Sequence, residues 1–287
     1  MNPDLHFDYT TVGHVTVDVF EDGSSRVGGA AFYSALQAAR LGLRALILTR
    51  GVAEEIEELL EPYRHELELE VLPAAHTTTL RTLGSGAARR QRVLAWAGPI
   101  AHELAVDTAI LHLAPVARES PDRWRGPAAF VGLTPQGLVR EWSGPDAEIG
   151  VCQPTNAAAE VARRCDAIVV SEHERPSCAE LIAAATAGGA VVAVTAGAHP
   201  NTILTPGGEL LELQVPPLEQ PADDVGAGDV FAAAFFVALS DGRSPLKAAS
   251  FANAAAAVRM SGTGAGAIGR REEIDARLLA TAAALER

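Results

Sequence analysis

The sequence has few cysteines, few basic residues and no long uninterrupted apolar run. Its three cysteines, Cys152, Cys165 and Cys178, are odd in number, lie far apart and form no Cys-x-x-Cys pair. This spacing argues against a disulfide framework and structural zinc, and it fits a reducing cytoplasm. The first residues show no basic leader or signal-like apolar stretch, and no run approaches the roughly 20 apolar residues of a membrane span. We therefore expect a cytoplasmic protein without a membrane partner.

Basic residues are outnumbered by acidic ones. The chain has 23 Lys and Arg against 36 Asp and Glu, which gives a net charge of −13 and a pI near 5.0. Proteins that neutralise nucleic-acid phosphates need clustered Lys and Arg, so we expect no nucleic-acid partner. A 48% hydrophobic content over 287 residues is enough to fill the core of one large domain or two small ones.

A glycine-rich turn at residues 221–231 precedes a long alanine-rich helical pattern. Gly226 and Gly228 flank Ala227, so the backbone can turn sharply and aim several amide hydrogens at one place. Such a helix start attracts anions, because its first amides lack partners and carry a partial positive charge. Asp229 would repel a bound phosphate, which makes sense if it accepts a proton from a hydroxyl that attacks phosphorus.

The alternative is that Asp229 only caps the helix, since aspartate is a favoured N-cap residue. The neighbouring residues favour the phosphate site. Asp223, Gly226-Ala227-Gly228, Asp229 and Phe231 resemble the C-terminal signature of the ribokinase-like family of sugar kinases, the phosphofructokinase-B type. The resemblance implies that the amides of Gly226, Ala227 and Gly228 form an anion hole for the transferred phosphate and that Asp229 is the catalytic base.

The first part of the chain has the features of an acceptor site. Strand-like alternation over residues 9–19 is followed by a polar turn, the pair Gly28 and Gly29, and a helical pattern. By resemblance, Asp18 holds substrate hydroxyls and the two glycines lie beside the sugar, although Asp18 alone could be a solvated strand end. Tyr33 replaces a common asparagine contact, and this segment is most similar to the myo-inositol kinase branch.

Two strand-like runs at residues 77–82 and 91–96 indicate a hairpin that crosses or borders the site. Two interpretations of its basic residues stay open. The charges could protect an exposed edge strand, or one or two of them could face a polar substrate, with Arg92 as our candidate. The basic residues of this hairpin are Arg81, Arg89, Arg90 and Arg92.

A further group of residues is assigned to the phosphoryl donor by the resemblance. Glu174 follows the apolar strand at residues 167–170 and would act on Mg²⁺ through water. Thr195 and Gly197 would line the phosphates and ribose of ATP. Asn253 would lie at the adenine pocket, although ordinary helix packing also explains its alanine-rich surroundings.

Apolar strand patterns alternate with helical patterns along the chain, and several strands are apolar on both faces. This predicts an α/β fold with a doubly wound, mostly parallel sheet flanked by helices. The loop at residues 132–137 would open on a cleft at the carboxyl end of a strand. We expect one domain over residues 1–287, with a β lid from segments near 14–28 and 79–96. An isolated lid would expose an apolar face, so we expect a homodimer formed through the lid.

These features together predict a kinase that uses ATP and Mg²⁺ to phosphorylate a hydroxyl of a small sugar or polyol. Two alternatives remain open. A nucleoside kinase would use the same machinery. A non-catalytic sugar-binding protein is suggested by Ser171, Tyr33 and His199, which depart from the family pattern, whereas the retained Asp229 favours an enzyme.

Overall fold

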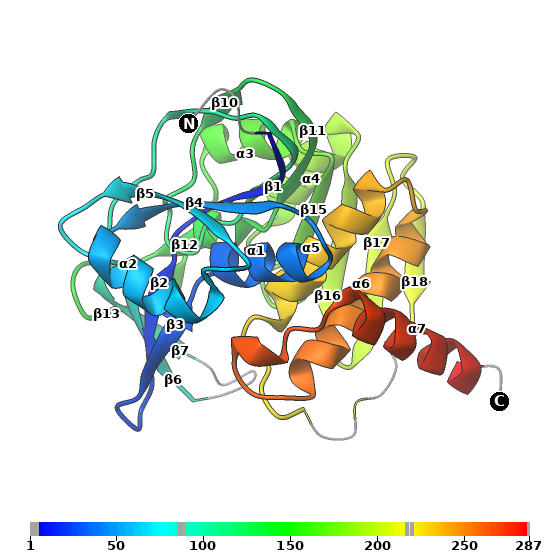
Figure 1. Cartoon of the computed structure of the whole chain (residues 1–287). Helices are drawn as coiled ribbons and strands as arrows, with labels where there is room; N and C mark the ends of the chain where they lie inside the picture. Colours follow the sequence, from blue (N-terminus) through cyan, green and yellow to red (C-terminus); the bar gives the residue numbers. More distant parts are fainter. Residues whose placement is uncertain (1–5, 85–89, 216–217, 219–220, 286–287) are drawn as a thin grey trace.

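A nine-stranded sheet forms the centre of the protein in the computed structural model, which describes residues 6–84, 90–215, 218 and 221–285 (Figure 1). Its strand order is β18-β17-β16-β15-β11-β9-β1-β4-β5. The pairs from β16 to β5 are parallel, and β17 and β18 add antiparallel strands at one edge. The strands are β1 (Phe7–Val12), β4 (Ala45–Gly51), β5 (Glu68–Pro73), β9 (Thr108–Leu113), β11 (Ala128–Leu133), β15 (Ala167–Ser171), β16 (Val191–Ala196), β17 (His199–Leu204) and β18 (Leu210–Leu213).

Helices cover both faces of this sheet, because its strands are apolar on both sides. Inward side chains of β1, β4 and β15 pack with α1, α2, α5 and α6 on one face, and α7 lies on α6 (Figure 1). The alternate side chains pack with α3 and α4 on the other face. The helices are α1 (Ala30–Arg40), α2 (Ala53–Leu60), α3 (Asn156–Arg163), α4 (Ala179–Gly188), α5 (Ala227–Ser240), α6 (Pro245–Met260) and α7 (Arg271–Leu285), with 3-10 turns η1 (Glu61–Tyr63), η3 (Pro135–Val139) and η4 (Ala265–Ala267).

This architecture is the predicted doubly wound α/β fold with a large, mostly parallel sheet. The sequence predicted this fold mainly from apolar runs that would be buried on both faces of a sheet. The strands formed by these runs lie in the interior of the central sheet. Across the described ranges, we find no helix with the length and apolar character required to cross a bilayer.

A second sheet with the strand order β13-β7-β6-β2-β3 lies at the lower left of Figure 1 and forms the lid. It contains both segments expected for the lid, and β13 adds a strand that the sequence did not indicate. Residues 85–89 of the hairpin, including Arg89, lie outside the described residues. The lid strands are β2 (Thr16–Val19), β3 (Ser25–Gly28), β6 (Thr79–Leu83), β7 (Arg90–Ala95) and β13 (Ala147–Glu148); two short pairs are β8 (Glu103–Ala105) with β10 (Arg123–Arg125) and β12 (Arg140–Glu141) with β14 (Gly150–Val151).

The single opening strand expected over residues 9–19 is wrong, because the chain leaves one sheet and enters the other there. Gly13 has no room for a side chain, since a Cβ would collide with the carbonyl of Ala114. The amide of His14 then donates to Glu119 Oε1 at 2.9 Å, and the amide of Val15 donates to Thr49 Oγ1 at 2.9 Å. At this crossing, side-chain oxygens thus accept the backbone hydrogen bonds that a neighbouring strand would otherwise accept. The alternation of apolar and polar residues does not encode such partners.

Candidate active site

A cavity of about 250 Å³ lies between the lid, the carboxyl ends of the central strands and the start of α5. It brings together eight of the predicted site residues from segments far apart in the sequence. Ala227, Gly28, Arg92, Gly197 and Asn253 do not line it. The predicted residues that line the cavity are Asp18, Gly29, Tyr33, Glu174, Thr195, Gly226, Gly228 and Asp229.

The turn before α5 presents backbone amides to this cavity. Gly226 is the N-cap residue of α5 and has φ 77°, a left-handed conformation that favours glycine. A side chain there would also collide with the ring of Tyr33. The amides of Gly226 and Gly228 have no acceptor among the described residues, whereas the Ala227 amide donates to Asp224 O at 3.2 Å. Two of the three expected anion-hole amides are therefore available, and the amide of Ala227 already has a partner.

Asp223 braces this turn from the side away from the cavity. Its carboxylate accepts hydrogen bonds from the amides of Val225 (2.9 Å) and Gly264 (3.0 Å). It also pairs with Arg259 at 2.9 Å and with Arg26 of lid strand β3 at 3.2 Å. Burial opposes its charged form, but these donors outweigh burial and lower the pKa of Asp223 to about 2. The carboxylate therefore stays ionised and joins the lid to the turn.

Asp229 lies in the first turn of α5 and lines the cavity. Burial of its carboxyl group, with a smaller contribution from the nearby Glu174 charge, raises the pKa of Asp229 to about 7. Arg140 opposes this shift, and the charge of Asp18 adds to it. A carboxylate whose pKa lies near neutral pH is matched to proton abstraction from an alcohol.

The lid and the start of α1 supply the opposite wall. Asp18 is 6% exposed and accepts a hydrogen bond from Thr16 Oγ1 at 2.8 Å. Gly28 of β3 pairs with Thr16 of β2, and a Cβ on Gly28 would collide with the Asp18 carboxylate. Gly29 has φ 97°, and a Cβ there would meet His14 O. Neither position has room for a side chain, because the end of β3 lies directly against β2 and against the backbone at His14.

Tyr33 connects the two halves of the cavity. Its ring lies against Gly226, and burial together with the nearby Asp18 charge raises the pKa of Tyr33 to about 12. The phenol therefore stays protonated at neutral pH and keeps a donor for a bound hydroxyl. Tyr33 thus fits the predicted position beside the acceptor.

Arg92 lies outside the cavity, contrary to the expected substrate contact. Its guanidinium donates to Asp146 O from two nitrogens and pairs with Asp146 Oδ1 at 3.2 Å. The preceding residue in β7, Gln91, lines the cavity instead, because successive side chains of a strand point to opposite faces.

Arg140 is the basic residue that lines the cavity, and the sequence interpretation missed it. Its guanidinium donates to Val116 O and Gln91 Oε1, both at 2.9 Å. Burial lowers the pKa of Arg140, while the charges of Glu174 and Glu119 favour its protonated form. Only its nearness in sequence to the loop at residues 132–137 could have pointed to it, because no motif contains it.

Glu174 follows β15 and turns its carboxylate toward the cavity. One oxygen accepts from Gln136 Nε2 at 2.8 Å, and the other accepts from Ser171 Oγ at 2.9 Å and Ser171 N at 3.1 Å. Across the described part of the chain, no cluster of three His, Cys, Asp or Glu residues could hold a metal directly. This donor set fits a cation held through water rather than by a cage of side chains.

The residues expected to bind a nucleotide separate into two groups. Thr195 of β16 lines the cavity, while Gly197 lies beyond it in the turn to β17 with φ 61°. Asn253 on α6 is 9% exposed, and its Oδ1 accepts a hydrogen bond from Asn201 Nδ2 at 2.8 Å. Asn253 is therefore hydrogen-bonded to β17, the strand next to the edge of the sheet.

Comparison with known proteins agrees with this geometry. The model of the pfkB family carbohydrate kinases matches residues 155–270, which include Glu174, Thr195 and the Asp229 turn. A search of curated proteins finds no match.

Solved structures resemble nearly the whole chain. They include a pyrophosphate-dependent kinase in the ribokinase family complexed with a pyrophosphate analog and myo-inositol (TM-score 0.73, 21% identity, 93% of this chain and 99% of that one). Methanocaldococcus jannaschii nucleoside kinase (0.70, 18%, 95% and 98%) and Arabidopsis thaliana ribokinase complexed with ribose and ATP (0.69, 18%, 96% and 99%) are also similar. The chain thus has the fold of these ribokinase-family structures over nearly its whole length, and its residues 155–270 match the model of the pfkB carbohydrate kinase family.

Proposed function

We propose that the protein transfers the γ-phosphoryl group of ATP to a hydroxyl of a small sugar or polyol. The observation that carries this proposal is the position of Asp229 in one cavity with Asp18 and with the amides of Gly226 and Gly228. A general base, a hydroxyl-binding carboxylate and an anion hole are three of the components that phosphoryl transfer to an alcohol uses.

In the proposed reaction Asp18 and Tyr33 orient the acceptor, and the Asp229 carboxylate takes the proton of its hydroxyl. The hydroxyl oxygen forms a bond to the γ-phosphorus as the bond to the β-phosphate oxygen breaks and ADP leaves. The amides of Gly226 and Gly228 stabilise the charge on the transferred oxygens, each contributing about 3 kcal/mol by analogy with other oxyanion holes. Arg140 lines the same cavity and adds a fixed positive charge.

Magnesium would bridge the donor phosphates and neutralise part of their charge. Glu174 is the residue proposed to hold it through water, since both of its oxygens are oriented by Gln136 and Ser171. Thr195 lines the same cavity, and we assign it to the phosphates of the donor.

An acceptor screen tests this function. The purified protein is incubated with ATP, Mg²⁺ and one of a panel comprising myo-inositol, ribose, fructose phosphates and nucleosides, and ADP release is recorded. We expect ADP release that depends on a sugar or polyol. Nucleoside-dependent release would favour the nucleoside kinase alternative. Sugar binding without any acceptor-dependent release would favour the non-catalytic alternative.

A second candidate donor is inorganic pyrophosphate. Asn253, assigned to the adenine pocket by resemblance, is bonded to Asn201 and does not line the cavity. A structure of similar fold is a pyrophosphate-dependent kinase in the ribokinase family. Repeating the screen with pyrophosphate in place of ATP, with phosphate release as the readout, decides between the donors.

We also propose that the protein acts in the cytoplasm as a homodimer formed through the lid. The free thiols of Cys165 and Cys178, both buried, agree with a reducing compartment. Asp18 lines the cavity, so Val17 and Val19 of the same strand lie on the other face of the lid.

A further inference from the structure

The guanidinium of Arg259 lies directly behind the turn that forms the anion hole. Arg259 is in the last turn of α6, and its side chain is 0% exposed. A fully buried cation is costly unless it is paired and hydrogen-bonded. Its partners therefore show what the cation does in this fold.

The hydrogen-bond acceptors of this guanidinium lie in the turn and in the loop that follows α6. Nη2 donates to Val225 O at 2.6 Å and to Asp223 Oδ2 at 2.9 Å. Nη1 donates to Gly262 O at 3.2 Å and to Asp223 O at 3.3 Å. Three carbonyls and one carboxylate thus surround one positive charge, which is a donor set that an inorganic cation would also accept.

The bond to Val225 O fixes the direction of the anion-hole amide. In a planar trans peptide the C=O and the next N–H point in opposite directions, so holding Val225 O behind the turn aims the Gly226 N–H forward. Val225 O is also the acceptor that the Asp229 amide would use if α5 began one turn earlier. That carbonyl bonds to Arg259 instead, and the Asp229 amide has no acceptor among the described residues; the same is true of the Gly228 amide.

The ring of Tyr33 also packs against the turn. Tyr33 lies against Gly226, and the guanidinium carbon of Arg259 is 5.8 Å from the centre of its ring. Arg26 from the lid shares the Asp223 carboxylate with Arg259. Arg259 therefore contacts Asp223, Val225 and the Tyr33 ring, and Asp223 connects it to the lid.

We propose that Arg259 is a positioning residue for phosphoryl transfer, a resident cation that holds the anion-hole amides toward the cavity. This inference rests on the proposed function, and it goes further by assigning the order of the anion hole to one buried side chain outside the cavity. The guanidinium fills the oxygen cage, so no added inorganic cation is needed to form the turn.

Kinetics of Arg259 variants test the proposal. For Arg259→Ala we expect kcat to fall roughly 100-fold, as when an oxyanion-hole donor is removed, with little change in the KM of the acceptor. Millimolar guanidinium should restore part of the lost kcat by entering the vacated cage. Arg259→Lys keeps the charge but loses the forked geometry, so its kcat should lie between the two. Wild-type kcat should be the same in sodium, potassium and choline buffers.

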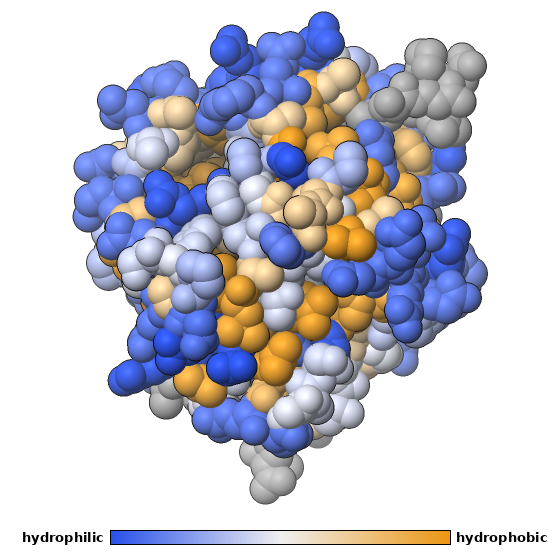
Figure 2. Space-filling model, turned by 90° about the vertical axis from the view of Figure 1, so that its left-hand side faces the viewer, coloured by the Kyte–Doolittle hydropathy of each residue, from blue (hydrophilic) through white to orange (hydrophobic). Residues whose placement is uncertain are grey.

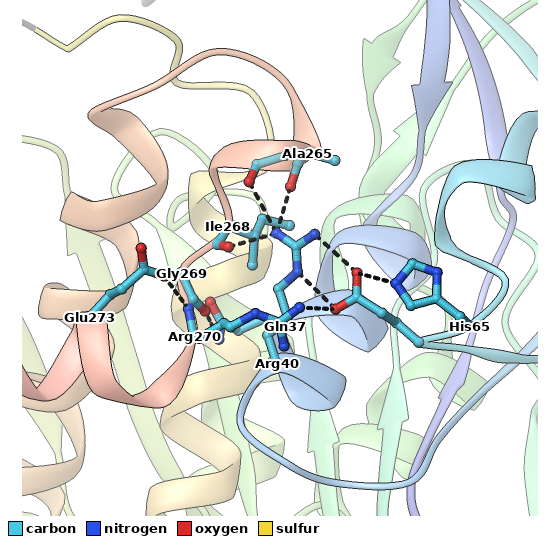
Figure 3. A network of polar contacts seen from close by, with 10 residues as sticks. Gln37, Arg40, His65, Ala265, Ile268, Gly269, Arg270 and Glu273 are labelled. Atoms are coloured by element: carbon cyan, nitrogen blue, oxygen red, sulfur yellow. Dashed lines mark hydrogen bonds and ion pairs between the residues drawn. The ribbon is translucent and has the colours of Figure 1, made fainter.

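Arg40 provides a matched control, since it is another largely buried arginine that binds backbone carbonyls (Figure 3). It donates to Ala265 O at 3.1 Å, Gly266 O at 3.2 Å and Ile268 O at 2.6 Å, and it pairs with Glu66 at 3.1 Å. Arg40→Ala should lower Tm while the folded protein keeps its kcat, and guanidinium should not increase that kcat.

An anion-binding measurement separates this proposal from the proposed function. Titration calorimetry with inorganic pyrophosphate should show binding to the wild-type protein and weaker binding to Arg259→Lys, whether or not an acceptor has been identified. A wild-type protein without turnover that still shows this difference would refute the kinase and retain the role of Arg259. Wild-type kcat and anion affinity in a folded Arg259→Lys or Arg259→Ala protein would overturn the proposal, as would a loss of kcat in Arg259→Ala that guanidinium does not reverse.

Discussion

Asp229 has a pKa of about 7 because the cavity disfavours its charged form. The folded pKa lies above the usual 3.8, so the folded state binds an extra proton between these two values. The stabilisation by this proton is complete below about pH 4. It declines as the pH rises through 7, and above that pH the folded protein retains a carboxylate whose burial Arg140 offsets only in part.

Replacing this carboxyl group should therefore stabilise the protein at alkaline pH. We expect Asp229→Asn to raise Tm by about 5 °C at pH 8 and to have little effect near pH 4. Thermal unfolding followed by circular dichroism over this pH range is the measurement. Asp241→Asn is the control, because Asp241 is exposed at the other end of the same helix. A pH-independent Tm difference for Asp229→Asn would contradict the assigned burial.

The sequence allowed a site residue to be predicted only where that residue belongs to a local motif. The glycines at 28, 29, 226 and 228 and the carboxylates Asp18 and Asp229 stand beside recognisable turns, and most of them line the cavity. Arg140 and Arg259 were missed, because each reaches its partners across many intervening residues and no spacing encodes such a contact. Arg92 was selected for its charge, but strand alternation turns Gln91 toward the cavity instead.

At the scale of elements, the start of α5 determines how closely a ligand can approach the free backbone amides of the proposed anion hole. A Cβ at Gly228 would meet no atom within 4 Å, so an alanine fits the fold there, and its methyl group would occupy open space beside the free amides. The fold itself thus does not require glycine at this position. Gly226 differs, since its backbone conformation and the Tyr33 ring both exclude a side chain.

Gly228→Ala should separate stability from activity. Alanine is favoured over glycine in a helix by up to about 1 kcal/mol, so we expect Tm to stay equal or rise slightly. Because the methyl group blocks the approach of the phosphate, we expect kcat/KM to fall roughly 100-fold. Steady-state kinetics and thermal unfolding measure the two effects. Gly266→Ala is the control, since a Cβ there also meets no atom within 4 Å and Gly266 lies outside the cavity. Unchanged kinetics in Gly228→Ala would place the phosphate elsewhere.

Elements with strong periodicity were predicted well, and their connections less well. The helical pattern after Gly29 forms α1, and the apolar run near residue 167 forms β15. The break at Gly13 and the added strand β13 depend on partners distant in sequence, such as Glu119 for the first and β7 for the second. Local patterns carry no information about such partners.

At the scale of the whole molecule, the lid closes the cavity and also presents an outer face. Figure 2 looks at the side of the molecule that carries the lid, and it shows apolar patches surrounded by hydrophilic residues in the lower half of this face. Val17 pairs with Val27 across β2 and β3, and Val19 lies beside Arg81 of β6. This mixture of apolar and charged residues is suited to a contact between two copies of the chain.

Sedimentation velocity should show a dimer for the wild-type protein. Val19→Lys places a charge on the outer face of the lid and should shift the protein to a monomer without a large change in Tm. Leu210→Lys is the control, because Leu210 is 58% exposed on the edge strand β18, which belongs to the central sheet. A monomeric wild-type protein, or a dimer that Val19→Lys leaves intact, would contradict association through the lid.

The most direct measurement is the turnover of Asp229→Asn with the acceptor identified in the screen. Asparagine keeps the size and the neutral state of the side chain but cannot take a proton, so donor binding should persist while kcat falls by about 10³-fold or more. In the wild-type protein, kcat/KM should rise with pH and level off above about 7, as Asp229 loses its proton. Near-normal turnover in a folded Asp229→Asn protein would show that this carboxylate is not the base.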